Sequence, residues 1–271
     1  MSIPVLLYHG VGMRVDPRFA RWVVTPTSFA EQMATLAAEG YSTITATQAA
    51  EALRSHRPAG ERVVAITFDD GFAEVHDSAW PVLRRHGLTA TVYVATGYVG
   101  DTSRWLHDEG EGTRPMLDWD QIAELADGGI EIGAHTESHV ALDTVSRARA
   151  AREIERSRDA LAAVVGPVAS FAYPYGYHRA SVRRQVREAG FTHAYTVGDG
   201  IASAADDRFA ITRAIVARET TTERFAEILA ARSGRVGRRP VRRAAWRAVR
   251  RAGGQPLVDR VRGAAAARPV G

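Results

Sequence analysis

Short apolar runs rich in β-branched residues alternate along this chain with longer stretches of amphipathic, helical spacing. The short runs predict strands at residues 3–8, 41–44, 63–68, 90–94, 130–134, 170–172, 192–196 and 209–216. The longer stretches predict helices at residues 28–39, 46–54, 73–86, 119–126, 146–165, 180–189 and 222–231. Thr27 is the predicted N-cap of the first helix, and the polar stretch 97–114 predicts a long loop.

This alternation indicates a parallel sheet covered by helices, the α/β class. About seven or eight β/α units within residues 1–231 fit a barrel better than an open sheet. We therefore predict a single catalytic domain at 1–231, followed by a basic C-terminal tail at 232–271 that is helical or disordered. In such barrels the functional side chains follow the C-terminal ends of the strands.

Four groups of polar residues directly follow predicted strands and so share one rim of the barrel. They are His9 after 3–8, Asp69 and Asp70 after 63–68, His135 and His139 after 130–134, and the turn 173–176 after 170–172. Taken singly, each of these groups has an ordinary structural explanation. Their shared position on one rim favours a functional role for all four.

The histidine spacing predicts a metal site. His135 and His139 are four residues apart, so one helical turn brings both imidazoles to one face. Asp70 completes a set of two imidazoles and one carboxylate, which leaves positions open for water and substrate. Asp69 then stays unligated as the candidate base. A helix-capping Asp-Asp-Gly turn and a surface histidine pair are the alternatives. Zinc is the ion expected first, although the same donors accept cobalt, nickel, iron or manganese.

Other rim residues are candidates for proton transfer and substrate contact. His9 stands where a general acid is needed, the alternative being a histidine hydrogen-bonded at a loop start. The turn that contains Tyr173 and Tyr175 can aim backbone N–H groups at a developing oxyanion, unless it is simply an aromatic-lined β/α turn. Trp119 is a candidate cover for the pocket or a packing residue at the start of a helix.

T-F-D-D-G at 67–71 and H-T-x-x-H at 135–139 together resemble the polysaccharide deacetylase family, the NodB-homology group of carbohydrate esterase family 4. The resemblance covers roughly residues 3–230 and implies a distorted (β/α) barrel, often with seven strands. It implies a divalent metal on Asp70, His135 and His139, with Asp69 as catalytic base. The opening Tyr8-His9 pair is most similar to the branch that deacetylates poly-N-acetylglucosamine, which implies His9 as the catalytic acid.

The chain departs from the family pattern at one motif. The family often has Arg-x-Pro-Tyr, whose arginine pairs with the base aspartate, whereas this chain reads A-Y-P-Y at 172–175. Arg213 is the candidate replacement, and a structural rim arginine is the alternative reading of that residue.

The amino-acid composition excludes several kinds of catalytic or metal site and one kind of binding partner. The chain has no cysteine, which excludes disulfides, thiol catalysis and cysteine-ligated zinc. Residues 232–271 hold 12 Arg and one acidic residue, whereas the rest of the chain holds 23 Arg and 30 acidic residues. The excess basic charge therefore belongs to the tail, and we expect no nucleic-acid partner. The amphipathic pattern at 238–251 suits peripheral contact with an anionic membrane, a solvated tail being the alternative.

The sequence as a whole predicts metal-dependent hydrolytic N-deacetylation of an N-acetylated sugar, in an oligosaccharide, polysaccharide or glycoconjugate, with release of acetate. The alternative is an amidohydrolase that acts on a small non-sugar amide or on an intracellular amino-sugar intermediate. A binding protein with an inactive site is disfavoured, because both aspartates and both histidines of the motifs are present. The apolar N-terminal stretch is too short for an export signal, so a cytoplasmic location is expected unless such a signal has been removed.

Overall fold

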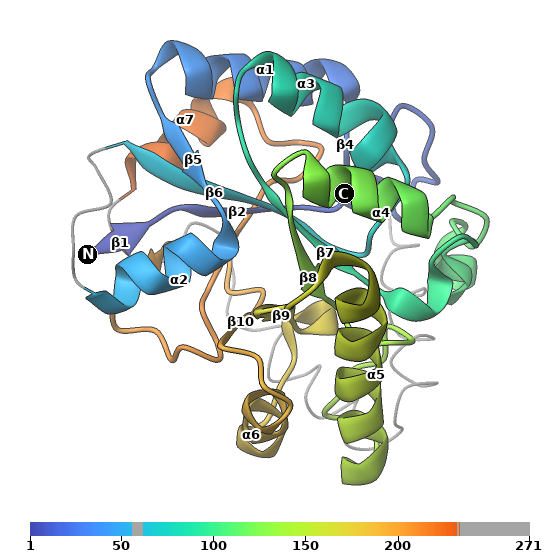
Figure 1. Ribbon diagram of the computed structural model, residues 1–271. Helices are drawn as coiled ribbons and strands as arrows, with labels where there is room; N and C mark the ends of the chain where they lie inside the picture. The colour runs from blue at the N-terminus through green and yellow to red at the C-terminus, as the bar shows by residue number, and fades with distance from the viewer. Residues whose placement is uncertain (56–61, 232, 234–271) are drawn as a thin grey trace, which may run out of the picture.

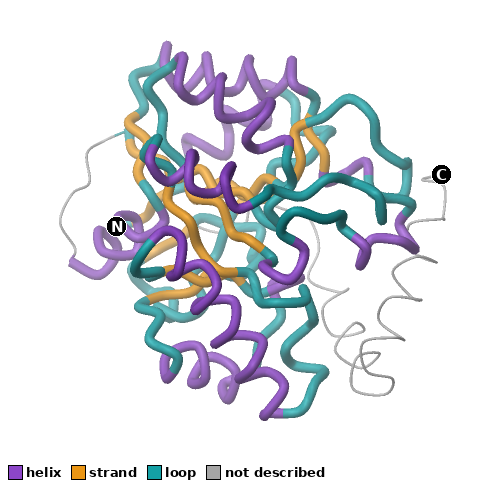
Figure 2. The backbone as a smooth tube through the Cα atoms, turned by 45° about the vertical axis from the view of Figure 1, so that its right-hand side comes forward, coloured by secondary structure: helices purple, strands orange, loops and turns teal. Residues whose placement is uncertain are grey.

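A parallel β-sheet curls through the centre of the molecule, and the helices lie outside it (Figures 1 and 2). The computed structural model describes residues 1–55, 62–231 and 233, so the predicted tail lies almost wholly outside the described residues. Along the sheet the strands follow in the order β10 (His193–Tyr195), β9 (Ser170–Ala172), β8 (Glu131–Ala134), β7 (Thr91–Val94), β6 (Val63–Phe68), β2 (Val5–Tyr8) and β12 (Ala214–Ile215). β5 (Ser42–Ile44) pairs with the first half of β6.

The two ends of this sheet meet through the segment that precedes β12. Ile211 bridges to Tyr195 of β10 in parallel register. The Ile211 N–H donates to the Ala194 carbonyl at 3.0 Å, and the Thr196 N–H donates to the Ile211 carbonyl at 2.8 Å. An isolated bridge thus stands where a regular barrel has a full ladder, which gives the distorted α/β barrel expected from the sequence.

Two strand predictions change in detail. Pro4 has no N–H to donate and separates β1 (Ser2–Ile3) from β2, so the predicted strand 3–8 is broken. The predicted strand 209–216 shortens to β12. Two small sheets are added, in which β1 pairs with β11 (Ala202–Ser203) and β3 (Gly10–Val11) pairs with β4 (Val23–Val24).

The helices cover the outside of the sheet, with α5 in contact with both α4 and α6. Their bounds are α1 (Pro26–Ala38), α2 (Ala46–Ser55), α3 (Trp80–Arg85), α4 (Trp119–Asp127), α5 (Arg147–Val165), α6 (Ala180–Glu188) and α7 (Thr222–Ala230). The predicted N-cap Thr27 is wrong. Thr25 caps α1 by accepting the Ser28 N–H at 3.1 Å, since Pro26 favours the first helical position.

The predicted helix 73–86 divides into two segments. A π-helical turn, η2 (Val75–Ala79), precedes α3. Pro81 is the second residue of α3 and has no N–H to donate to the turn before it, which accounts for the irregular helix at this point. Short 3-10 turns occupy the loops, at η1 (Ala20–Trp22), η3 (Thr96–Tyr98), η4 (Arg104–Glu109) and η5 (Pro174–Gly176).

The alternation of side chains along β6 directs one carboxyl group into the barrel. Val64, Ile66 and Phe68 belong to the large core between the sheet and the helices. Ala65 belongs to the smaller cluster inside the barrel, and Thr67 and Asp69 continue that row two residues at a time. Among the described residues, none of the helices has the length and apolar character needed to cross a bilayer.

Candidate metal centre and active site

The three predicted metal ligands converge at the ends of β6 and β8, two strands that β7 separates in the sheet. Asp70 follows β6, and His135 and His139 lie in the loop after β8. Asp70 Oδ1 lies 3.5 Å from His135 Nε2 and 3.0 Å from His139 Nε2. All three ligand atoms lie within 4.8 Å of one another, and all three side chains are buried.

The surroundings of this triad fit a divalent cation. Asp70 Oδ1 is buried without a hydrogen-bond donor in the described part of the chain. His135 Nδ1 lies 2.8 Å from the Ala172 carbonyl, so it carries the proton and leaves the Nε2 lone pair directed at Asp70. His139 Nδ1 lies 3.2 Å from the Tyr175 hydroxyl. Two imidazoles and one carboxylate are donors that zinc and neighbouring transition metals accept.

The loop that carries the two histidines is not helical, so the predicted helical turn is wrong. Thr136 and His139 instead adopt left-handed backbone conformations, with φ of 69° and 53°. Asp70 is left-handed too, with φ of 76°, and Gly71 continues the turn at 85°. Non-glycine residues rarely hold this conformation without support from their surroundings, and it concentrates at functional sites. These local reversals, in place of a helix, bring the three ligands together.

Asp69 forms a buried, bidentate ion pair with Arg213. Arg213 Nη1 and Nη2 each lie 2.7 Å from one oxygen of Asp69. Nη1 also donates to Thr67 Oγ1 at 3.1 Å, and Nε donates to the Thr196 carbonyl at 3.3 Å. Arg213 precedes β12, which pairs with β2. The residue chosen from the sequence as replacement for the missing motif arginine therefore contacts Asp69.

This ion pair keeps Asp69 ionised despite its burial. Burial alone would raise the pKa of Asp69, but the charges around it, the Arg213 guanidinium foremost, outweigh burial and hold the pKa below its ordinary value. A carboxylate that is ionised at neutral pH and held in place by a fixed cation is able to accept a proton, although its lowered pKa makes it a weak base.

His9 lies at the same rim, half-buried, with its ring 4.8 Å from the ring of Trp22. Loss of water lowers the pKa of His9, while the charges of Asp70 and Asp69 act in the opposite direction. A lowered pKa makes the imidazolium a stronger acid and reduces its population at neutral pH.

The remaining predicted residues divide between the site and the core. Tyr175, left-handed at φ 60°, packs its ring 4.7 Å from His139. Tyr173 is fully buried, and its hydroxyl donates to the Phe209 carbonyl at 2.9 Å. Trp119 begins α4 and packs, half-buried, against the large core. For Tyr173 and Trp119 the structure therefore supports the packing alternatives.

Two tryptophans that the sequence interpretation overlooked lie against the histidines. The ring of Trp105 in η4 lies 4.9 Å from that of His139, and Trp22 lies against His9 as described. Both are half-buried and come from loops between the elements of the sheet. The signal that could have found them is a large aromatic residue in a rim loop with no helical or strand periodicity around it.

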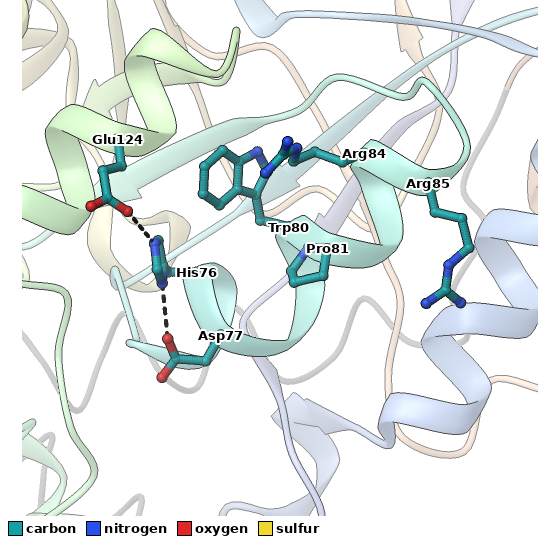
Figure 3. Close-up of a pocket in the computed structure, with 7 residues that line it drawn as sticks. All are labelled: His76, Asp77, Trp80, Pro81, Arg84, Arg85 and Glu124. Atoms are coloured by element: carbon teal, nitrogen blue, oxygen red, sulfur yellow. Dashed lines mark hydrogen bonds and ion pairs between the residues drawn. The ribbon is translucent and has the colours of Figure 1, made fainter.

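A shallow hollow elsewhere on the surface is lined by residues that largely partner one another (Figure 3). It lies over η2, α3 and α4. His76 contacts Asp77 at 2.8 Å and Glu124 at 2.9 Å, and the Arg84 guanidinium lies 5.0 Å from the centre of the Trp80 ring. The two carboxylates raise the pKa of His76, although burial alone would lower it. These contacts join α4 to the helical segment after β6.

Residues 56–194, about half of the chain, match the family described as polysaccharide deacetylase. The chain belongs to this family. The Bacillus subtilis protein YxkH, named for the same family, is 26% identical to this deacetylase over 213 residues, covering 78% of this chain and 70% of YxkH. The poly-β-1,6-N-acetyl-D-glucosamine N-deacetylase of Escherichia coli is 27% identical over 246 residues. That match covers 78% of this chain and 36% of the relative, so this deacetylase spans about a third of the length of that protein.

Solved structures share the fold of this deacetylase. Streptococcus pyogenes deacetylase PplD, in complex with acetate, has a TM-score of 0.74 at 24% identity, covering 85% of this chain and 99% of PplD. IcaB from Ammonifex degensii has a TM-score of 0.68 at 25% identity, covering 84% of this chain and 96% of IcaB. The distorted barrel predicted from the sequence is thereby confirmed, as is the predicted class of enzyme, a deacetylating hydrolase.

Replacing Arg213 by Met is expected to destabilise the protein, because it leaves the carboxylate of Asp69 buried without its cation. The loss expected near pH 7 is about 3–5 kcal/mol in the free energy of unfolding, measured by urea denaturation. Asp69 supports stability fully above its unfolded pKa of about 3.9, and this support is lost as pH falls through its lower folded pKa.

The exposed pair of Arg224 and Glu227 supplies the control. Arg224→Met should cost at most about 1 kcal/mol. Adding Asp69→Asn to Arg213→Met should recover part of the loss, since no unpaired charge then remains. Equal stability of the Arg213 and Arg224 variants would contradict the account.

Proposed function

We propose that this chain is a metal-dependent N-deacetylase that removes acetyl groups from an N-acetylated saccharide. The observation that carries the proposal is the placement of two adjacent carboxyl groups in different settings. Asp70 converges with His135 and His139, whereas Asp69 is held by Arg213. An amide hydrolase needs both an electrophilic centre and a base beside it.

Asp70, His135 and His139 would hold the divalent ion, with zinc as the proposed metal. A bound ion of this kind supplies Lewis acidity, which lowers the pKa of water and polarises an amide carbonyl. The three side chains leave coordination positions open, as hydrolytic sites require.

Asp69 takes the proton of the attacking water, and Arg213 keeps the carboxylate oriented while it does so. The backbone N–H of Tyr175, in its left-handed turn, faces the developing oxyanion in this proposal. His9 as imidazolium donates a proton to the departing nitrogen, because an amine leaves poorly unless it is protonated. Water and the N-acetyl amide are thereby converted into acetate and a free amino sugar.

The substrate class follows from the family and its relatives. The Escherichia coli relative is an N-deacetylase of poly-β-1,6-N-acetyl-D-glucosamine, which supports an N-acetylglucosamine oligomer as the first substrate to test. The half-buried rings of Trp22, beside His9, and of Trp105, beside His139, suit the apolar face of a pyranose.

Acetate release from N-acetylglucosamine oligomers by the zinc-loaded protein tests this function. Asp69→Asn is expected to keep the metal, measured by elemental analysis, yet to lose roughly two to four orders of magnitude in rate. A variant that loses the ion and regains full activity when zinc is added would show that Asp69 is a ligand. Release from small non-sugar amides alone would favour the alternative amidohydrolase.

His9→Ala is expected to keep both fold and metal but to act slowly on N-acetyl sugars. The same variant should be impaired much less on an activated acetyl ester, whose leaving group needs no proton. Comparing kcat/KM on the two substrates checks the assignment. An equal loss on amide and ester would argue against His9 as the acid.

A further inference from the structure

A buried carboxyl group on α5 is hydrogen-bonded to the loop that carries the two histidines. Glu153 Oε2 accepts the Ser138 N–H at 2.8 Å, and Glu153 Oε1 accepts the Ser138 hydroxyl at 2.6 Å. The Glu153 backbone carbonyl accepts the Glu137 N–H at 3.1 Å. Glu153 therefore holds the two consecutive residues that directly precede His139.

The carboxyl group of Glu153 is buried, so its hydrogen bonds to Ser138 are needed to stabilise it. Its side chain is only 6% exposed, and the cation beside it, Arg149, is 50% exposed with its Nε 3.6 Å from Oε1. A buried acidic group is costly unless its oxygens are hydrogen-bonded, and here Ser138 satisfies both of them. The apolar side of an ordinary surface helix would place an aliphatic residue at this position.

The opposite side of the same loop is held by the segment after β7. The Thr96 N–H donates to the Thr136 carbonyl at 3.1 Å, and the Gly97 N–H donates to the Glu137 carbonyl at 2.7 Å. A side chain at residue 97 would bring its Cβ within 2.6 Å of that carbonyl oxygen, so the close approach requires glycine. The loop is thus fixed between α5 and the end of β7.

These contacts restrict the backbone of the loop at His139. His139 has φ of 53°, a left-handed conformation that a non-glycine residue keeps only when its surroundings hold it there. Its Nε2 must nevertheless point at Asp70 Oδ1, 3.0 Å away, for the two to share an ion. Fixing Ser138 on its N-terminal side limits the ways in which the backbone at residue 139 can relax.

We propose that Glu153 is a positioning residue for the metal centre, acting through Ser138 on the orientation of His139. This inference rests on the metal site of the proposed function and is independent of which saccharide is the substrate. Groups that hydrogen-bond directly to a metal ligand typically contribute 10- to 100-fold to metal affinity, which sets the scale for a residue that acts through the ligand's neighbour.

Cobalt(II) binding to the full chain tests the proposal without measuring catalysis. We expect Glu153→Ala to weaken cobalt affinity by about 10- to 100-fold in competition with a chelator, and to alter the visible spectrum of the bound ion. Glu155 is an exposed acid on the same helix, and Glu155→Ala should leave affinity and spectrum unchanged. Wild-type affinity and spectrum in Glu153→Ala would overturn the proposal.

Two further variants separate positioning from charge and from loss of fold. Glu153→Gln keeps one oxygen for the Ser138 N–H and an amide that can donate to the hydroxyl, so it should restore most of the affinity. If Gln fails as badly as Ala while remaining folded, the negative charge matters and the positioning proposal is wrong. Ser138→Ala removes one contact and should give an intermediate loss, which keeps the test available if Glu153→Ala does not fold.

The same titration distinguishes this inference from the proposed function. A wild-type protein that binds no cobalt would contradict the metal centre itself. A wild-type protein that binds cobalt, with unchanged binding in the folded Glu153 and Ser138 variants, would contradict only the role of Glu153.

Discussion

Two neighbouring carboxyl groups, both buried at the end of β6, must each be balanced by a different cation. Arg213 balances Asp69 through two hydrogen bonds of 2.7 Å, and the geometry of Asp70 with the two histidines provides for the second cation. Adjacent buried carboxylates would otherwise repel each other and take up protons. The distorted barrel meets this constraint by bringing β12, β6 and β8 to one rim, so that groups far apart in sequence surround a single dipeptide.

The same constraint explains the backbone strain at the site. Asp70, Thr136, His139 and Tyr175 all have positive φ, and in the described part of the chain only Asp199 joins them among non-glycine residues. Each such residue costs about 1–3 kcal/mol, which contacts with its surroundings must offset. The supports are visible here as the carbonyl contacts of Thr136 and Glu137 and the carboxyl group of Glu153.

The sequence predicts the structure correctly where the local pattern of residues decides it. The buried run at 63–68 is β6 to the residue, and Asp70, His135 and His139 meet because the ends of parallel strands share a rim. The sequence does not predict features that depend on tertiary contacts or on the backbone conformation of single residues. The histidine spacing suggested a helical turn, but a strained loop performs that task, and hydrogen-bond partners such as Ser138 and Glu153 have no signature in the spacing of motifs.

X-ray absorption at the zinc edge of protein loaded with one equivalent of zinc tests the metal centre most directly. The account predicts nitrogen and oxygen neighbours at about 2.0–2.2 Å with the outer-shell scattering of two imidazole rings. His139→Ala should reduce this to one ring. A zinc environment without imidazole scattering, or one that His139→Ala leaves unchanged, would contradict the assignment of Asp70, His135 and His139 as the ligands.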